Sequence, residues 1–261
     1  MKRLCKAILI VWMLCGSVSA VMADGTAAGN EQLLQRAREL LTAYKDNEAL
    51  ALYEQVLSDS ENNYEALCKA SYLHCRIGER FADESSKLSH FEKARSLALH
   101  AYIIKPEDAE SNYVMALSLG CTAMVAGPRQ RLAAIYQVKP YIDKALSYNM
   151  QHDGAWYVLG RWYFKVANLN LAEQVAAKLF FGGVKEKATN QDAVDALNKA
   201  IRYNPDNIRY YYDLACVYKE MKDKDASINT LRKALTVNME TTEELELSRR
   251  CKIMLEEEYA K

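Results

Sequence analysis

Apolar residues along most of the chain recur at intervals of three and four, the spacing that places them on one face of an α-helix. The stretch DGAWYVLGRWYFKVA, residues 153–167, shows this pattern clearly, with Trp156, Leu159 and Tyr163 on one face and Gly160 among them. Gly (10 residues) and Pro (4 residues) are scarce, so the chain has few of the breaks that a loop-rich β-protein needs. The pattern therefore predicts an all-α chain of long amphipathic helices.

A second helical stretch follows, in which small and large apolar residues alternate at fixed distances. In QDAVDALNKAIRYNP these positions are Ala193, Leu197, Ala200 and Pro205. Together the two stretches match the two-helix signature of a tetratricopeptide repeat, in which small residues let neighbouring helices cross closely. Half-matches recur in the same order, as Ala94, Ala98, Ala101 and Pro106, and as Tyr211, Leu214, Ala215 and Tyr218. One full match with several halves indicates a repeat protein.

The repeat pattern locates pairs of helices along the chain. First helices are predicted near 31–44, 63–77, 107–121, 153–167 and 207–221. Second helices are predicted near 46–58, 86–104, 138–149, 190–203 and 224–237. Stacked in order, these pairs form a right-handed, tetratricopeptide-like helical-repeat solenoid, which is the fold class that we predict.

Two further helices depart from the ~34-residue period of the repeat. An inserted helix is predicted near 168–181 and ends at Gly182-Gly183, since glycine is the usual residue after a helix. We expect it to bury its apolar face on the solenoid, with a role as a lid over a partner as the alternative. A last helix near 242–259, with a capping pattern at Thr241, is expected to cover the apolar end of the stack.

The first 23 residues differ from the rest of the chain. Basic residues precede the apolar run AILIVWMLC, and small residues lead to Ala23, which is the order found in a secretory signal peptide. The run is shorter than the ~20 apolar residues that span a bilayer. We predict a cleaved signal peptide at 1–23, an exported chain in the periplasm or envelope, and a single helical-repeat domain over 24–261. An uncleaved N-terminal anchor is the alternative.

Charge and motifs give no sign of catalysis or of nucleic-acid binding. Lys+Arg and Asp+Glu both number 34, and removal of residues 1–23 leaves 31 basic residues against 34 acidic ones. A nucleic-acid-binding protein would carry a basic excess. The sequence has no Gly-rich phosphate loop, no GxSxG and no HExxH. The five cysteines after residue 23 form no CxxC and are expected to be small buried apolar residues. We predict no enzyme activity, no metal and no cofactor.

Two stretches resemble a known family: AGPRQRLAAIYQVKPYIDKAL at 126–146 and WYVLGRWYFKVANLNLAEQVAAKLFFGG at 156–183. They resemble the tetratricopeptide-like proteins related to the regulators of microtubule dynamics, and the resemblance extends over roughly residues 60–240. It implies a helical-repeat fold and a protein-binding role without a catalytic site. Microtubule association is not carried over, because an export signal would separate the chain from tubulin, whose acidic surface favours a basic partner.

In helical repeats of this kind the first helices line the concave surface. The positions that follow the Trp-equivalent residue, and those four and eight further on, then face the groove. The residues that we predict to contact a partner there are Tyr72, Arg76, Tyr113, Tyr157, Arg161, Lys165 and Tyr212. Tyrosine offers broad contact area with a polar tip. We therefore predict a non-catalytic scaffold that binds a protein or an extended peptide, if neither the inserted helix nor the last helix fills the groove.

Two other functions fit the same pattern. The chain is alternatively an architectural subunit of a cell-envelope complex, held through its convex face or its insertions. It is alternatively a lipid- or small-molecule-binding solenoid whose inserted apolar helix roofs a pocket. Membrane contact is expected only through the signal segment or a partner, and the pattern leaves the oligomeric state open.

Overall fold

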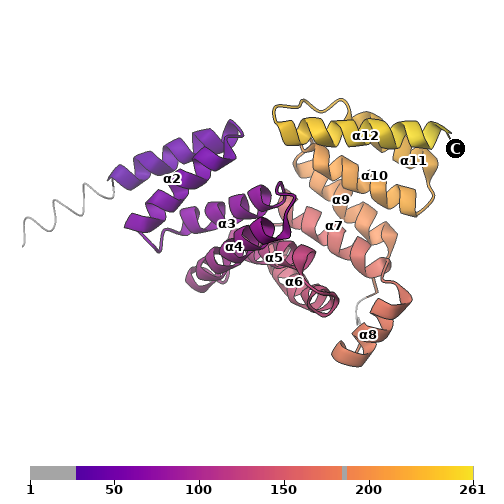
Figure 1. The fold of residues 1–261 in the computed structure, drawn as a ribbon, viewed down its shortest axis with the longest axis horizontal. Helices are drawn as coiled ribbons and strands as arrows, with labels where there is room; N and C mark the ends of the chain where they lie inside the picture. Colours follow the sequence, from indigo (N-terminus) through magenta and orange to yellow (C-terminus); the bar gives the residue numbers. More distant parts are fainter. Residues whose placement is uncertain (1–27, 184–186, 261) are drawn as a thin grey trace, which may run out of the picture. The chain divides into compact units, whose positions relative to one another are not determined.

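The computed structural model describes residues 28–183 and 187–260, so the predicted signal peptide at 1–23 lies outside the described residues. Every regular element in these ranges is an α-helix (Figure 1). The chain divides into two compact units, residues 1–70 and 71–261, and each is considered by itself. The single domain over 24–261 stays a prediction.

The first unit contains a helix over residues 28–42, then α2 (Asp46–Asp59) and the beginning of α3 (Tyr64–Gly78). The turn before α2 is tight, and Tyr44 within it takes a φ of 56°. Arg38 donates to both carboxylate oxygens of Glu65, each at 2.6 Å. The second-helix positions of the repeat pattern are fully buried in α2, at Ala49, Tyr53 and Val56. This unit is therefore one helical repeat that leads into the first helix of the next.

The second unit contains the remainder of α3 and a series of helices stacked on their neighbours. They are α4 (Glu84–Ile104), α5 (Ala109–Val125), α6 (Pro128–Tyr148), α7 (Asp153–Ala167), α8 (Leu171–Phe181), α9 (Asn190–Tyr203), α10 (Ile208–Glu220), α11 (Lys224–Ala234) and α12 (Thr242–Ala260). The most extensive contacts join α4 with α5, α5 with α6, α7 with α9, and α10 with α11. These are the helix pairs and stacks that the repeat pattern predicts, and the all-α helical-repeat fold is confirmed.

The seam between α7 and α9 shows why the repeat signature specifies small residues. A Cβ atom added at Gly160 would lie 2.7 Å from Cγ of Leu197 and 3.3 Å from the carbonyl oxygen of Ala193. Only glycine at this position lets the two helices cross so closely. On its other side, α7 is tied to α6 by Trp162, whose Nε1 donates to the carbonyl oxygen of Ile135 at 2.7 Å. Helix α7 is thus joined closely to α9 at Gly160 and to α6 through Trp162.

Helix α6 is longer than the predicted helix at 138–149, since it already begins at Pro128. Proline suits the first position of a helix, where its missing N–H has no intrahelical role. Pro140 lies inside the helix, and its missing N–H deprives the carbonyl of Tyr136 of its usual donor. The helix nevertheless continues, because α6 packs against α5. Tertiary packing therefore outweighs the local signal of a proline.

The ends of the inserted helix and of the last helix follow their capping signals. The inserted helix is confirmed as α8, with a capping box between Asn170 and Glu173 and a left-handed Gly182 (φ 76°) after its last residue. Before α12, the amide of Glu244 donates to Oγ1 of Thr241 at 3.1 Å, and the Thr241 amide donates back to the Glu244 carboxylate at 3.0 Å. Apolar residues of α12 complete the core formed by α10 and α11, as expected of a terminal helix.

The expectation that the inserted helix buries its apolar face on the solenoid is wrong. Helix α8 contacts α6, yet Ala177 is its one buried residue. Its large apolar residues are between 54% and 77% exposed, at Leu171, Val175, Leu179 and Phe180. Apart from Phe181, whose ring stacks on Tyr136 of α6 with 4.8 Å between centroids, the large apolar residues of α8 are exposed. None of the helices in the described ranges is long and apolar enough to cross a membrane.

Candidate functional site

The seven residues predicted to face the groove all lie in the second unit, on α3, α5, α7 and α10. Their exposure varies widely. Tyr113 and Tyr157 are buried, each with 7% of its surface exposed. The side chains of Arg161 and Lys165 are about half exposed, at 46% and 47%. The remaining three are partly buried, namely Tyr72, Arg76 and Tyr212.

Two tyrosines of this face form a buried stack. The rings of Tyr157 on α7 and Tyr210 on α10 lie 4.8 Å apart, with 26° between their planes. The hydroxyl of Tyr157 donates to Asp213 at 2.7 Å, and that of Tyr210 donates to Asp153 at 2.9 Å. Burial raises the pKa of both tyrosines, and the neighbouring carboxylates raise it further. Both hydroxyls therefore remain protonated and act as hydrogen-bond donors to the two aspartates.

Tyr113 is also enclosed by its own chain. A Cβ atom on Gly154 would lie 2.7 Å from the Tyr113 ring, and the ring of His152 lies 4.4 Å from it between centroids. His152 in turn contacts Glu110, with 3.2 Å between Nε2 and Oε2. Burial raises the pKa of Tyr113. The start of α7 thus packs over Tyr113, and this tyrosine forms part of the contact between α5 and α7.

Arg209, near the start of α10, is the centre of a group of charged side chains. Its guanidinium donates to Glu79, just after α3, at 2.9 Å, and also to Glu243 in the first turn of α12. Glu243 pairs further with Arg80 at 3.1 Å and with Arg76 at 3.8 Å. Burial opposes ionisation of Glu243, but its three arginine neighbours lower its pKa overall. These contacts join the end of α3 to the first turns of α10 and α12.

Arg161 extends this group along α7. Its Nε lies 3.8 Å from Oδ2 of Asp213, and its guanidinium lies 5.8 Å from the centroid of the Tyr157 ring. We call the set the concave ion cluster; it consists of Arg76, Glu79, Arg80, Arg161, Arg209, Asp213 and Glu243. The set combines four arginines with three carboxylates.

Lys165, the other half of the predicted basic patch, is directed elsewhere. Its ammonium group binds Glu173 in the first turn of α8 at 2.7 Å. This hydrogen bond lowers the pKa of the Glu173 carboxyl. Lys165 therefore connects α7 to the inserted helix, and Arg161 is the half-exposed cation of α7 that belongs to the cluster.

The sequence left open whether the inserted or the last helix fills the groove. In the structure α8 contacts α6, whereas the first turn of α12 reaches the concave ion cluster through Glu243. Sequence reasoning missed Tyr210, Arg209 and Glu79. Tyr210 precedes the repeat position at Tyr211 and was hidden in a run of three tyrosines. Charged residues at helix ends are too common in any sequence to indicate a cluster.

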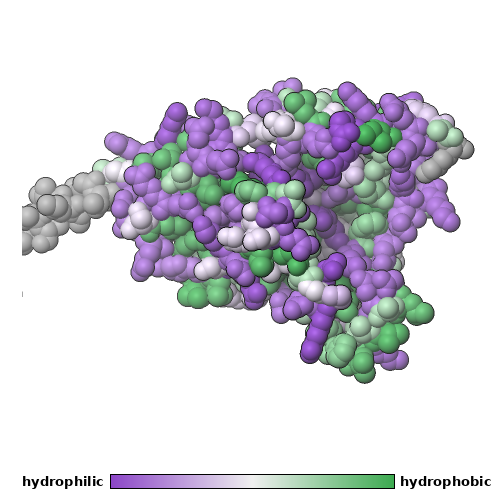
Figure 2. Space-filling model, viewed as in Figure 1, coloured by the Kyte–Doolittle hydropathy of each residue, from purple (hydrophilic) through white to green (hydrophobic). Residues whose placement is uncertain are grey.

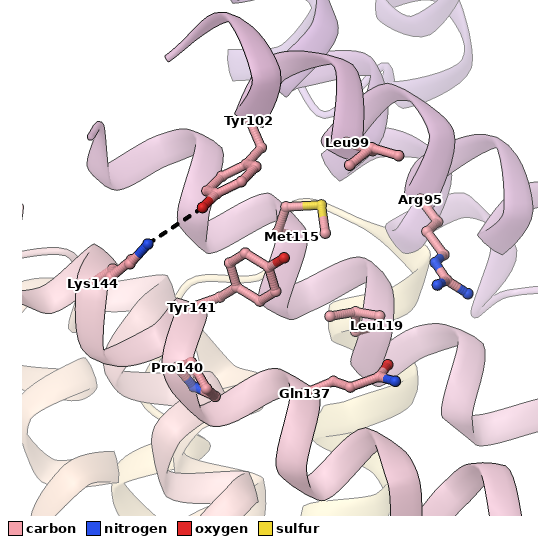
Figure 3. Close-up of a pocket in the computed structure, with 9 residues that line it drawn as sticks. All are labelled: Arg95, Leu99, Tyr102, Met115, Leu119, Gln137, Pro140, Tyr141 and Lys144. Carbon is pink, nitrogen blue, oxygen red and sulfur yellow. Dashed lines mark hydrogen bonds between the residues drawn. The ribbon is translucent and has the colours of Figure 1, made fainter. Parts of the chain in front are cut away.

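A hollow with a volume of about 500 Å³ lies between α4, α5 and α6; we call it the α4–α6 groove (Figure 3). The rings of Tyr102 and Tyr141 meet edge to face at 5.3 Å, and Lys144 donates to the Tyr102 hydroxyl at 3.3 Å. Lys144 and Arg95 lie at opposite ends of the groove (Figure 3). Its other lining residues are Leu99, Met115, Leu119, Gln137 and Pro140. The lining therefore combines apolar and aromatic surface with two cations and no carboxylate.

The described residues offer neither a cluster of metal-binding side chains nor a reactive thiol. Within 28–183 and 187–260, no group of three or more His, Cys, Asp or Glu side chains is placed to hold a metal ion. None of the five described cysteines forms a disulfide, and Cys216 is the one among them that is not fully buried. Burial raises the pKa of the Cys251 thiol to about 12 and that of Cys216, with help from Asp213, to about 11. These thiols are protonated at neutral pH.

Comparison with known proteins identifies a matching family. The sequence profile of the family described as "Regulator of microtubule dynamics protein 1-3" matches residues 33–260. Regulator of microtubule dynamics protein 3 from Rattus norvegicus is 27% identical over 194 residues, which cover 72% of this chain and 41% of the relative. Regulator of microtubule dynamics protein 1 from Caenorhabditis elegans is 22% identical over 195 residues, which cover 74% of this chain and 86% of the relative. The chain thus spans less than half the length of the rat protein.

Among solved structures, the chain is similar to a thermophilic TPR protein from Thermus thermophilus. The two share 18% sequence identity with a TM-score of 0.58, over 87% of this chain and 98% of the other. At this identity the likeness concerns the fold alone, which is that of a tetratricopeptide-repeat protein.

Proposed function

The chain belongs to the Regulator of microtubule dynamics protein 1-3 family, and from that premise we propose that it is a non-catalytic scaffold that binds another protein through the concave face of its second unit. Its fold supports this proposal, because tetratricopeptide-like proteins generally present a curved surface of helices to protein or peptide partners. The predicted partner is a protein or an extended peptide.

The observation that carries the proposal is the position of Arg161. Its side chain is 46% exposed, and its guanidinium lies 5.8 Å from the centroid of the Tyr157 ring, within the concave ion cluster. Its Nε lies 3.8 Å from Asp213, beyond hydrogen-bonding distance, so Arg161 has donors to offer a second carboxylate. Arginine binds carboxylates through two parallel hydrogen bonds. An acidic side chain or a peptide C-terminus is the ligand that this arrangement favours.

Binding is best tested with substitutions at positions of the face that solvent reaches. Tyr157 is buried, so replacing it would test folding as well as binding. We therefore choose Arg161→Glu combined with Tyr212→Ala, and Arg202→Glu on α9 as the control, because Arg202 is an exposed basic residue of another helix. A partner captured by the wild-type protein under native conditions is identified and purified, and its affinity for each variant is measured.

The double variant is expected to lose roughly tenfold or more in affinity, since it removes a charge-assisted contact and an aromatic surface. The control variant is expected to bind as the wild type does. Equal affinities for all three proteins would refute the concave face as the binding site, provided that their melting temperatures agree.

Export is part of this proposal. The basic and apolar residues of the N-terminal segment support a signal peptide that is cleaved after Ala23. An exported chain would meet a partner in the periplasm or envelope. It would not meet tubulin, although the relatives are named for microtubule dynamics. N-terminal sequencing of the protein isolated from its own cells tests the assignment: a chain that starts at Met1 would contradict cleavage.

A second candidate function is favoured by the α4–α6 groove. Its volume of about 500 Å³ falls within the range of ~300–1,000 Å³ that small-molecule sites occupy. Apolar lining between two cations suits an anionic ligand with an apolar body. Native mass spectrometry of the purified protein tests this: a copurified anion that Met115→Trp displaces would support the groove. A ligand-free spectrum, with no anion bound on addition of a fatty acid, would refute it.

A further inference from the structure

Helix α8 exposes an apolar surface that the protein itself does not cover. Leu171 and Leu179 are 77% and 74% exposed, and Val175 between them is 59% exposed. With about 100° of rotation per residue, these three and Phe180 form an arc of about half the helix circumference. The space-filling view shows the hydrophobic colour gathered at α8, in the lower part of the view (Figure 2). A soluble protein rarely leaves such a contiguous surface exposed without a function.

The exposure of this face is not the result of a loosely attached helix. At its N-terminal end α8 has a complete capping box, and Lys165 of α7 binds Glu173 at 2.7 Å. At its C-terminal end Phe181 stacks on Tyr136 of α6, with 4.8 Å between ring centroids. Ala177, between the two ends, is buried. The helix is therefore attached along one side, and Leu171, Val175, Leu179 and Phe180 are exposed to solvent.

Two cations flank the exposed face. The guanidinium of Arg129, in the first turn of α6, lies 5.2 Å from the centroid of the Phe180 ring. Lys178 lies about 20° around the helix from Leu171, at the edge of the apolar arc. Both cations are exposed, and no described carboxylate forms an ion pair with either of them. The one acid of α8, Glu173, is bound to Lys165. The surface is thus apolar with a positive border.

We propose that α8 is an interfacial helix that lies flat on an anionic membrane surface, with its apolar arc among the acyl chains and its cations at the lipid headgroups. This combination of an apolar face with basic flanks is the one that binds such surfaces. A second copy of the chain is a poorer match, because one 11-residue helix offers less than the ~800 Å² per partner of a stable interface. The N-terminal segment, predicted to direct the chain to a membrane, agrees with this location.

The test places a reporter on α8 itself, so that any contribution of the N-terminal segment is not read. The full chain carries the environment-sensitive dye NBD on a cysteine introduced by Val175→Cys. The control carries it at Ile103→Cys on α4, which is also exposed, at 69%. Vesicles of phosphatidylcholine alone, or mixed with phosphatidylglycerol, are then added. The dye at residue 175 is expected to shift to the blue and brighten several-fold with the anionic vesicles, and the dye at residue 103 is not.

Two sets of substitutions separate the apolar from the electrostatic contribution. Leu171→Asp with Leu179→Asp is expected to weaken vesicle binding roughly a hundredfold, since each buried leucine contributes about one factor of ten. Arg129→Glu with Lys178→Glu is expected to weaken binding to anionic vesicles and to leave the weak binding to neutral vesicles unchanged. All four positions are exposed, so circular dichroism melts are expected to match the wild type.

Three results would overturn the proposal. The first is no change of the dye at residue 175 with either vesicle. The second is an equal response to neutral and anionic vesicles, which would remove the role of the cations. The third is a dye response without vesicles that rises with protein concentration and disappears with the leucine substitutions, which would identify a second copy as the occupant. Concave-face binding does not involve these residues, so its failure and the failure of this proposal are distinguishable.

Discussion

The concave ion cluster and α8 differ in which kind of side chain they bury and which kind they expose. The cluster consists of charged residues, yet Arg209, Glu79 and Glu243 are each less than a third exposed and bind one another. Helix α8 consists largely of apolar residues, yet Leu171 and Leu179 are about three-quarters exposed. Hydropathy by itself would assign the two regions the other way round. Whether a side chain finds a partner within the chain, rather than its residue type, therefore decides whether it is buried or exposed.

The two regions also differ in energetic terms. Partly buried charges lose hydration, and only close opposite charges and hydrogen bonds offset that loss, so Glu79, Arg209 and Glu243 tolerate little change. Exposed apolar residues cost little in the folded protein beyond what they already cost in the unfolded chain. Substitutions of these three charged residues therefore act on stability, whereas substitutions of the half-exposed Arg161 and of the apolar residues on α8 act on binding.

Removal of the carboxylate that holds three arginines has the largest expected effect. Glu243→Ala takes one partner from each of Arg209, Arg76 and Arg80, and we expect a loss of about 2–3 kcal/mol in the free energy of unfolding. Urea denaturation followed by circular dichroism measures it. Glu246→Ala on the same helix is the control: Glu246 pairs with two arginines at the surface, and the stability of that variant is expected to stay unchanged. Equal effects of the two substitutions would contradict the cluster's role.

A smaller effect is expected from one hydroxyl in the tyrosine stack. Tyr157→Phe keeps the ring on Tyr210 but removes the donor that binds Asp213 at 2.7 Å, and we expect a loss of about 1–2 kcal/mol. The same denaturation experiment measures it. Tyr203→Phe on α9, where the tyrosine is partly exposed, is the matched control and is expected to change nothing measurable. A Tyr157→Phe variant as stable as the wild type would show that Asp213 accepts a hydrogen bond from another donor.

Acid is expected to weaken the wild-type protein through Glu243. The pKa of this group is lowered in the folded state, so its contribution is complete above the unfolded value of about 4.5 and is lost as the pH falls through the folded value. Melting temperatures measured between about pH 6 and pH 3 should therefore decline less steeply for Glu243→Gln than for the wild type. Parallel curves for the two proteins would mean that the pKa of Glu243 is the same in the folded and unfolded states.

The smallest effect on stability is expected on α8. Leu171→Ser with Leu179→Ser removes two large apolar side chains, yet the free energy of unfolding should change by less than about 0.5 kcal/mol because both are exposed. Leu197→Ala, in the buried seam between α7 and α9, is the contrasting control and should cost about 3 kcal/mol. A large loss in the α8 variant would show that these leucines pack against the protein.

The candidate site was only partly predictable. The spacing of the repeat signature predicted that Tyr157 and Arg161 share the inner face of their helix, and in the structure the Arg161 guanidinium lies 5.8 Å from the centroid of the Tyr157 ring. Spacing alone did not reveal that Tyr210 stacks on Tyr157 and encloses it. Glu79 and Arg209 bind one another although they lie 130 positions apart. No local pattern carries information about a pair so distant in the chain.

Local sequence patterns were sufficient to predict the helices, their pairing and most of their ends, because helical faces and capping depend on residues three and four positions apart. Gly160, the capping box at Asn170 and the glycines after α8 are examples. Which helix faces pack against a neighbour depended on the tertiary structure. The distance between residues of different repeats depends on the angles of every helix crossing between them, and small differences in side-chain packing set each angle. For this reason α8 kept its predicted position in the chain and not its predicted burial.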